Sequence, residues 1–192
     1  MFYKILKFII AIFIYPIFRV KVIGRENIPE SQGYILCANH KSNLDPIFLA
    51  IAFPSNIRFM AKKELFENKL LAGLLKSIGV FPVNRKGRDL SSLKNSIKLL
   101  KDENVLGIFP EGTRTHEISR QNMKDGVAYI ALKTKKDILP VEIVSSYKPF
   151  RKTYIYINEP INVDNYLNMK SKEAMVKMTD EVFNEIYKSQ LT

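Results

Sequence analysis

His40 and Asp45 are the first side chains in this sequence whose types and spacing could support catalysis. They lie in segment 39–46, which reads Asn-His-Lys-Ser-Asn-Leu-Asp-Pro. Because proline is favoured at the first position of a helix, we expect a helix to begin at Pro46 with His40 in the turn before it. A carboxylate bound to one imidazole nitrogen leaves the other nitrogen to accept a proton from a hydroxyl group. The residues alone leave an alternative, in which Asp45 only caps this helix and His40 is a polar turn residue.

A second segment, 109–114, reads Phe-Pro-Glu-Gly-Thr-Arg and combines groups suited to a phosphate ligand. The planar guanidinium of Arg114 matches phosphate oxygens, and Gly112 lets the backbone approach a ligand closely. Glu111 adds a carboxylate. The alternative is an ordinary turn after a strand.

A third segment, 79–85, reads Gly-Val-Phe-Pro-Val-Asn-Arg and ends in Arg85, which Lys86 and Arg88 follow. A plain basic surface cluster explains it equally well. Nucleotide phosphate loops, dinucleotide fingerprints, serine-hydrolase elbows and carboxylate metal loops have recognisable patterns, and the sequence contains none of them. The remaining chemistry is a histidine base acting on a hydroxyl group and basic side chains binding phosphate.

The elements that must position these groups alternate between strands and helices. A helix is expected after Asp89, and another is expected around residues 174–186, because apolar residues recur there at helical spacing. Apolar, β-branched runs predict strands at 34–38, 57–61, 105–109, 138–144 and 153–158. This order predicts an α/β fold with a mostly parallel central sheet flanked by helices. Lys62 and the first two segments then follow strands at one sheet edge, where functional groups gather.

Composition narrows the function classes. A chain of 192 residues suits one domain with a small appendage. The single cysteine, Cys37, cannot form an internal disulfide and is expected in the core, and two histidines with one cysteine cannot assemble a Cys/His zinc site. Residues 1–100 hold 16 Lys+Arg and 6 Asp+Glu, a net charge of +10, out of +11 for the chain. This asymmetry favours an anionic membrane surface over nucleic acid as the partner, with a solvated basic surface as the alternative.

The N-terminal segment combines that charge with an apolar run. Residues 8–18 are uninterrupted apolar side chains, flanked by Lys4 and Lys7 before and by Arg19 and Lys21 after. About 20 apolar residues are needed to span a bilayer, so the run predicts a retained helix lying in the cytoplasmic face of the cell membrane, as a peripheral or monotopic anchor. We assign residues 1–23 to membrane association and 24–192 to the domain. The alternative is a helix packed on the domain's own core.

The three segments together resemble the 1-acylglycerol-3-phosphate acyltransferase family, within the wider glycerolipid acyltransferase group. Its Asn-His-x4-Asp motif stands here at 39–45, its second block at 79–85, its third at 109–114 and a weak apolar fourth block at 138–141. Lys62-Lys63-Glu64-Leu65 is similar to the family's Lys-x-Glu-Leu stretch, and Lys124-Asp125-Gly126 to its Lys-x-Gly. The blocks occur in the family's order over about residues 20–145.

The resemblance implies the transfer of a fatty acyl group from acyl-CoA or acyl carrier protein to the hydroxyl of lysophosphatidate. His40 would be the general base and Asp45 would orient its ring. The resemblance assigns the phosphate to Arg114 and Lys62, with Arg85 added, and the substrate pocket to Glu111, Gly112 and Thr113. It implies no metal and no cofactor beyond the acyl-carrier co-substrate.

Three other functions stay open on the sequence. The same motifs would serve an enzyme that acylates glycerol 3-phosphate or another lysolipid. A non-catalytic lipid-binding protein on the membrane surface would share the fold and charge. A nucleic-acid binder is disfavoured because the second half of the chain is nearly neutral and the first begins with an apolar run.

Overall fold

Seven strands form one sheet in the part of the chain that the structure, a computed structural model, describes: residues 2–30, 33–77, 79–83 and 90–191. The strand order is β1-β7-β6-β2-β5-β3-β4. Strands from β6 to β4 in this order are parallel, whereas β7 is antiparallel to β6 and carries β1 parallel to itself. The strands are β1 (Val20–Ile23), β2 (Ile35–Ala38), β3 (Ile57–Lys62), β4 (Phe81–Val83), β5 (Val105–Ile108), β6 (Ile138–Ser145) and β7 (Thr153–Ile157). The predicted mostly parallel sheet is therefore confirmed.

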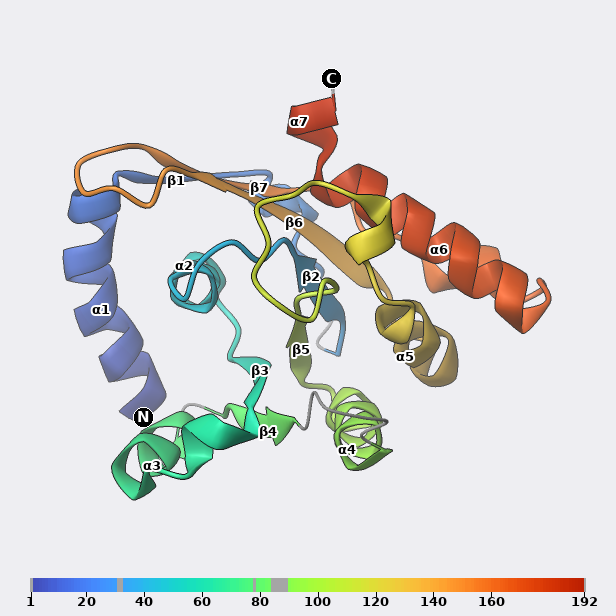
Figure 1. The fold of residues 1–192 in the computed structure, drawn as a ribbon, viewed down its shortest axis with the longest axis horizontal. Coiled ribbons are helices and arrows are strands. Elements are labelled where there is room, and N and C mark those ends of the chain that lie inside the picture. Colours follow the sequence, from blue (N-terminus) through green and yellow to red (C-terminus); the bar gives the residue numbers. More distant parts are fainter. Residues whose placement is uncertain (1, 31–32, 78, 84–89, 192) are drawn as a thin grey trace.

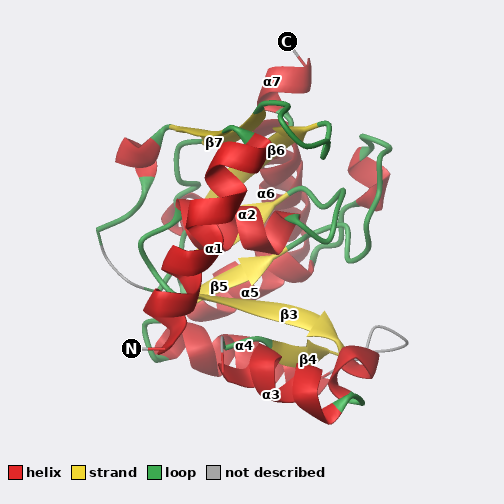
Figure 2. Cartoon of the chain, turned by 90° about the vertical axis from the view of Figure 1, so that its left-hand side faces the viewer, coloured by secondary structure: helices red, strands yellow, loops and turns green. Residues whose placement is uncertain are grey.

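Helices cover both faces of this sheet. In Figure 1, α1 and α2 lie on one side, while α5 and α6 lie on the other; Figure 2 places α1 and α2 in front of the strands. The helices are α1 (Phe2–Phe18), α2 (Asp45–Ala52), α3 (Lys69–Ser77), α4 (Leu90–Lys101), α5 (Gly126–Thr134), α6 (Ser171–Ile186) and α7 (Lys188–Leu191). Short 3₁₀ turns η1 (Arg25–Asn27), η2 (Lys63–Phe66), η3 (Arg120–Asn122) and η4 (Val163–Tyr166) join some of them.

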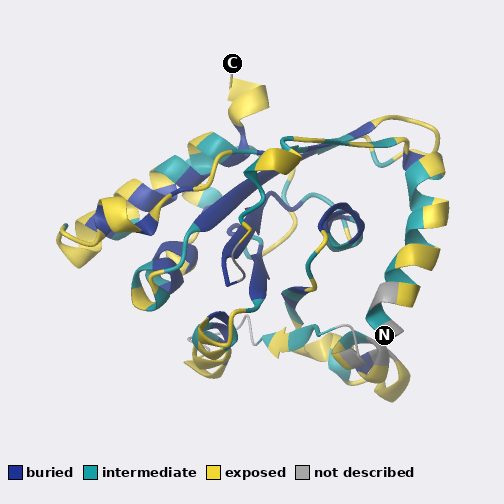
Figure 3. Ribbon diagram, turned by 180° about the vertical axis from the view of Figure 1, so that it is seen from behind, coloured by how far each residue is buried: buried dark blue, intermediate teal, exposed yellow. Residues whose placement is uncertain are grey.

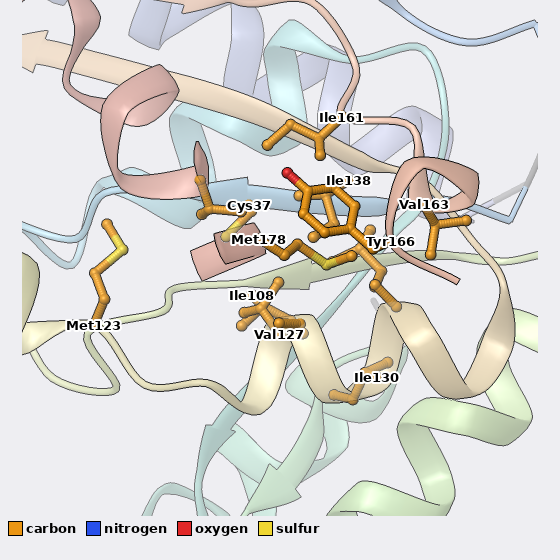
Figure 4. Close-up of a cluster of buried hydrophobic side chains, with 14 of the residues drawn as sticks. Cys37, Ile108, Met123, Val127, Ile130, Ile138, Ile161, Val163, Tyr166 and Met178 are labelled. Carbon is orange, nitrogen blue, oxygen red and sulfur yellow. The ribbon is translucent and has the colours of Figure 1, made fainter. Parts of the chain in front are cut away.

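Two apolar clusters sandwich the sheet because successive side chains of a strand point to opposite faces. Ile35 and Cys37 of β2 belong to the cluster under α5 and α6, and Leu36 and Ala38 belong to the cluster under α1 and α2. Figure 3 shows the central strands buried along their length, and Figure 4 shows Cys37 among the side chains of the first cluster. Cys37 is thus the core residue that its apolar context predicts.

Residues 2–18 form helix α1, one side of which is packed on the domain. Phe18 is buried, and Ile14 and Ile17 are partly buried against the cluster under α2. The other side exposes large apolar side chains, which are Ile5, Phe8, Ile9, Ile12 and Phe13. Within the described residues, every helix is too short or too polar to cross a bilayer. Residues 20–23 form the edge strand β1, although the sequence-based division assigns them, together with this helix, to the membrane-association segment 1–23.

The connections after β2 and β5 form a topological switch point, where open α/β sheets have a crevice outside the carboxyl ends of their strands. The connection from β2 to β3 passes through α2 on one face, and that from β5 to β6 passes through α5 on the other. Because the chain leaves neighbouring strands toward opposite faces, space opens between their ends, and ligands of open α/β sheets bind at such a switch point. Segments 39–46 and 109–114 begin at this point.

Candidate active site

His40 and Asp45 form a direct pair at the end of β2. Nδ1 of His40 lies 2.9 Å from Oδ2 of Asp45, and both residues are buried. Asp45 has no exposed surface, and 8% of His40 is exposed. Because the carboxylate occupies Nδ1, Nε2 is the nitrogen that can take a proton from a bound hydroxyl group.

Asp45 is an organising centre and does not cap α2. The helix begins at Asp45, one residue before the predicted start, and its N-cap is Leu44. Oδ2 of Asp45 accepts hydrogen bonds from the backbone N–H groups of Lys41 and Ser42, both at 2.7 Å. The interpretation of Asp45 as a cap is therefore wrong: its side chain folds the turn that carries His40 back toward the helix.

The His40 ring lies against an aromatic wall. Its centroid is 4.1 Å from that of Phe109, with an angle of 18° between the planes, and Phe109 stacks in turn on Phe59 at 5.9 Å. Gly107 makes this possible because a Cβ there would lie 2.4 Å from the Phe59 ring. The ring of His40 is thus held edge-on by a hydrogen bond and face-on by stacking.

Asn39 joins the active-site turn to the sheet. Its side-chain Oδ1 accepts from the backbone N–H of Ile143 at 2.7 Å, and its Nδ2 donates to the carbonyl of Ile143 at 3.0 Å. The amide therefore continues the β2–β6 pairing one residue beyond the strand. This fixes where the chain leaves the sheet, and with it the backbone position of His40.

Glu111 lies on the other side of the His40 backbone. Its Oε1 accepts from the hydroxyl of Tyr187 at 2.8 Å and from the N–H of His40 at 3.4 Å. Among the described residues, none hydrogen-bonds the buried Oε2. Burial raises the pKa of the Glu111 carboxyl above its ordinary value, and the hydrogen bonds from Tyr187 and from backbone N–H groups oppose that rise.

The remaining predicted site residues surround this centre less tightly. Gly112 has a φ of +70°, and a Cβ there would lie 2.7 Å from Nζ of Lys124, so this lysine also reaches the segment. Thr113 and Arg114 are exposed. Lys62 is the last residue of β3 and forms an exposed ion pair of 3.4 Å with Glu64. Arg85 lies outside the described residues.

An apolar cavity of about 260 Å³ is lined in part by Phe109, whose ring stacks on that of His40. It lies between β3, β5, α4 and α5, and Phe109 and Gly112 contribute to its wall. Most of its lining is apolar, with Met60, Leu93 and Ile108 among its walls. Such a cavity suits a hydrocarbon chain, because burying apolar surface is favourable.

A larger depression, of about 650 Å³, lies between α1, η1 and the end of α2, and neither His40 nor Asp45 lines it. Its two cations already bind the carboxyl end of α2: Lys7 donates to the carbonyl of Phe53, and Arg25 donates to that of Ala52 at 3.0 Å. Cations there complement the helix dipole. Burial lowers the pKa of Lys7. The cations of this depression therefore have a structural role at the end of α2. The larger volume of the depression does not make it the candidate active site.

Two tyrosines in the site were not identified from the sequence. Tyr147 donates to Oδ1 of Asp45 at 2.8 Å, and Tyr187 donates to Glu111. Each lies far along the chain from its partner and outside any motif, so no local pattern could have found them. For Tyr147 the sequence offered one indication, which is its position shortly after the predicted strand at 138–144.

The chemistry that this arrangement supports is proton abstraction by an imidazole next to an apolar cavity and exposed cations. Across the described residues, no group of three or more His, Cys, Asp or Glu side chains could hold a metal ion. The buried Asp45 carboxylate can stabilise the imidazolium that forms when His40 takes up a proton.

The chain is similar to known acyltransferases over most of its length. The acyltransferase family profile matches residues 19–144. A 1-acyl-sn-glycerol-3-phosphate acyltransferase of Bacillus subtilis is 37% identical over 173 residues, which cover 87% of this chain and 86% of that protein. A protein of the same name from Borreliella burgdorferi is 32% identical over 164 residues, covering 84% of this chain and 64% of that protein.

A solved structure shares the fold. The crystal structure of the 1-acyl-sn-glycerophosphate acyltransferase from Thermotoga maritima matches with a TM-score of 0.73 and 25% identity. The match covers 99% of this chain and 82% of that one.

Proposed function

Because this chain belongs to the 1-acyl-sn-glycerol-3-phosphate acyltransferase family, we propose that it transfers a fatty acyl group from a thioester to the free hydroxyl of 1-acyl-glycerol-3-phosphate, giving phosphatidic acid. The observation that carries this proposal is the buried His40–Asp45 pair, 2.9 Å apart, at the switch point of the sheet. The acyl donor is acyl-CoA or the acylated form of acyl carrier protein, and the product enters phospholipid biosynthesis.

His40 acts as the general base. Nε2 takes the proton of the substrate hydroxyl while the hydroxyl oxygen attacks the thioester carbonyl. Asp45 stabilises the resulting imidazolium through its hydrogen bond to Nδ1. The new C–O ester bond forms, the C–S bond breaks, and the proton passes from Nε2 to the departing thiolate. Stacking on Phe109 and the hydrogen bond to Asp45 keep the ring in one orientation for both transfers.

The acceptor's phosphate binds to the cations of the second and third family segments and of β3. Arg114 supplies the guanidinium, and Lys62 and Arg85 are further phosphate ligands; Lys62 has to exchange its exposed partner Glu64 for the phosphate. Glu111, Gly112 and Thr113 shape the pocket for the glycerol portion. Lys124, whose Nζ lies against Gly112, joins this group as a fourth cation.

One acyl chain occupies the apolar cavity behind Phe109. Phe109 and Gly112 line this cavity between α4 and α5, and the Phe109 ring stacks on His40, which supports a chain in the cavity with its reacting end directed toward His40. The proposed reaction needs no cofactor beyond the acyl-carrier co-substrate, because the thioester supplies the acyl group and His40 supplies the base.

Helix α1 holds the enzyme against an anionic membrane. Its exposed apolar side chains enter the acyl boundary, and nearby lysines and arginines meet acidic headgroups. The proposed location is the cytoplasmic face of the cell membrane, as a peripheral or monotopic protein, with residues 1–23 for membrane association and 24–192 as the acyltransferase domain. Nucleic acid is not a partner.

The test is thiol release by the purified full-length protein with palmitoyl-CoA and, separately, palmitoyl-acyl carrier protein. The acceptors compared are 1-acyl-glycerol-3-phosphate, glycerol 3-phosphate and a lysophospholipid without a phosphomonoester. We expect thiol release and phosphatidic acid with the first acceptor, and a loss of about 10²–10⁴-fold in His40→Ala. Asp45→Asn should lose less, because it keeps a polar partner for the ring.

Preference for another acceptor would reassign the substrate but keep the chemistry. Membrane binding without thiol release from any acceptor would leave only the non-catalytic lipid-binding function. Near-normal turnover by purified His40→Ala would rule out His40 as the base.

A further inference from the structure

Tyr147 is the one side chain outside segment 39–46 that the structure shows hydrogen-bonded to the Asp45 carboxylate, among the described residues. Its hydroxyl donates to Oδ1 of Asp45 at 2.8 Å, whereas His40 and two backbone N–H groups occupy Oδ2. The two oxygens therefore have different tasks. Oδ2 binds the catalytic ring and its own turn, and Oδ1 is tied to a distant element.

The fold delivers Tyr147 to this point from the end of β6. Its backbone N–H donates to Oγ of Ser145 at 2.9 Å, and that hydroxyl shares a hydrogen bond of 2.7 Å with Thr153 on the neighbouring strand β7. Tyr147 has a φ of +56°, a left-handed conformation that costs a non-glycine residue about 1–2 kcal/mol. The chain keeps a tyrosine there although the turn would suit glycine.

The ring of Tyr147 also packs on α2. It stacks on Phe48 with centroids 6.2 Å apart and an angle of 14° between the planes. Phe48 is buried one turn after Asp45 on the same helix. The phenol is thus directed at Asp45 by packing on one side and by the Ser145 turn on the other.

We propose that Tyr147 is a positioning residue of the active site: by holding Oδ1, it fixes the rotation of the Asp45 carboxylate and thereby the direction in which Nε2 of His40 points. This inference rests on the proposed function of His40 as the base. Tyr147 does not touch the reacting atoms. It acts through Asp45, since a carboxylate held at both oxygens cannot swing about its terminal bond.

Tyr147 stays a neutral donor throughout the working range. Burial, and then the negative charge of Asp45, raise the pKa of the Tyr147 hydroxyl well above its ordinary value. A neutral donor draws electron density from the carboxylate. Removing it leaves Asp45 more strongly attractive to a protonated imidazole.

The groups that face His40 come from four elements. They are Asp45 on α2 and Glu111 after β5, with Tyr147 after β6 acting through Asp45 and Tyr187, the C-cap of α6, acting through Glu111. A substitution of Tyr147 that keeps its ring changes only the contact with Asp45. Tyr147→Phe is therefore the diagnostic variant, because it keeps the stack on Phe48.

The first measurement is steady-state kinetics of the full-length protein with palmitoyl-CoA and 1-acyl-glycerol-3-phosphate over a range of pH. We expect Tyr147→Phe to lower kcat about tenfold, with the acceptor KM within about twofold of its original value. The acid limb of the kcat/KM profile should move to higher pH by about half a unit. The matched control is Tyr154→Phe, which removes the hydroxyl of a tyrosine on β7 that stacks on Tyr156. It should change neither kcat nor the acid limb of the kcat/KM profile.

The second measurement needs no substrate. The chain has only two histidines, so His116→Gln leaves His40 as the single imidazole signal in a ¹H–¹⁵N NMR titration. In that background, Tyr147→Phe should raise the titration midpoint of His40, and Tyr154→Phe should leave it in place.

Three results would overturn the proposal: an unchanged midpoint, a lowered midpoint, or a loss of kcat equal to that of Tyr154→Phe. If the unsubstituted protein turns over no acceptor, the proposed function fails, and the NMR midpoint still decides whether Tyr147 controls His40.

Discussion

The hydroxyl of Tyr187 donates a 2.8 Å hydrogen bond to Oε1 of Glu111, joining two residues that are 76 positions apart. Tyr187 is the C-cap of α6, and Glu111 lies near the start of the loop after β5. Both side chains are buried, and the same Oε1 receives the backbone N–H of His40. Burial, and then the Glu111 charge, raise the pKa of the Tyr187 hydroxyl, so it stays a donor. The C-terminal helix thus supports the turn that carries His40 through a buried carboxyl group.

Glu111 should make stability depend on pH. Its pKa is raised in the folded protein, so between the unfolded-state value and the folded-state value the native state binds more protons than the unfolded state. The free energy of unfolding must then fall as pH rises through this window. We expect Glu111→Gln, which cannot ionise, to gain stability relative to the unsubstituted protein as pH rises above the ordinary glutamate pKa of about 4.3.

Urea unfolding at several pH values measures this difference. Glu117→Gln, an exposed residue of the same loop, is the matched control and should show a difference that does not vary with pH. A pH-independent difference for Glu111→Gln would show that its carboxyl ionises as easily when folded as when unfolded.

Arg114 should affect the acceptor and spare the donor. A charge-assisted hydrogen bond to phosphate is worth about 1.5–3 kcal/mol, so Arg114→Ala is expected to raise the lysophosphatidate KM about tenfold or more. The acyl-donor KM should stay nearly unchanged. Arg151→Ala, another exposed arginine, is the control in the same initial-rate measurement. A rise confined to the donor KM would move Arg114 from the phosphate to the acyl carrier.

The apolar cavity should set the chain length that the enzyme accepts. Ser96 is buried in its wall on α4, so Ser96→Leu would fill part of the space. We expect the ratio of kcat/KM for a 12-carbon acyl donor to that for a 16-carbon donor to rise severalfold, because a shorter chain still fits. Asn95→Leu adds the same side chain on the exposed side of that helix and should leave the ratio unchanged. An unchanged ratio in Ser96→Leu, with retained activity, would show that the cavity does not hold the acyl chain of the donor.

Helix α1 should determine membrane binding through its exposed face. Phe8 and Phe13 are 67% and 62% exposed, so replacing both with aspartate leaves the packed side of the helix intact. Deleting residues 1–18 is a poorer test, because Phe18 is buried in the core. We expect the double variant to lose about 2 kcal/mol or more of binding to vesicles that contain phosphatidylglycerol.

Vesicle sedimentation measures this binding. Val176→Asp, which charges an exposed apolar residue on α6 across the sheet, is the control and should sediment normally. Equal sedimentation of all three proteins would mean that the exposed face of α1 does not enter the membrane.

Much of the site follows from short-range sequence patterns. His40 and Asp45 are five residues apart and are joined by one turn, so their pairing is visible in the spacing, and Pro46 correctly indicated a helix at that point. The apolar runs predicted the central strands because a strand buried on both faces needs continuous apolar residues. The edge strand β1 and the reversed direction of β7 were missed, because strand direction depends on which neighbour a strand finds.

Residue types and their spacing are enough to indicate which groups of this protein can exchange a proton, which can bind phosphate, and which runs must be buried. How those groups are held depends on the tertiary fold. Tyr147 reaches Asp45 across 102 positions, and Tyr187 reaches Glu111 across 76. The physical reason is that local spacing constrains residues within a turn, whereas contacts between distant residues depend on the order of strands in the sheet and on the face to which each connection crosses.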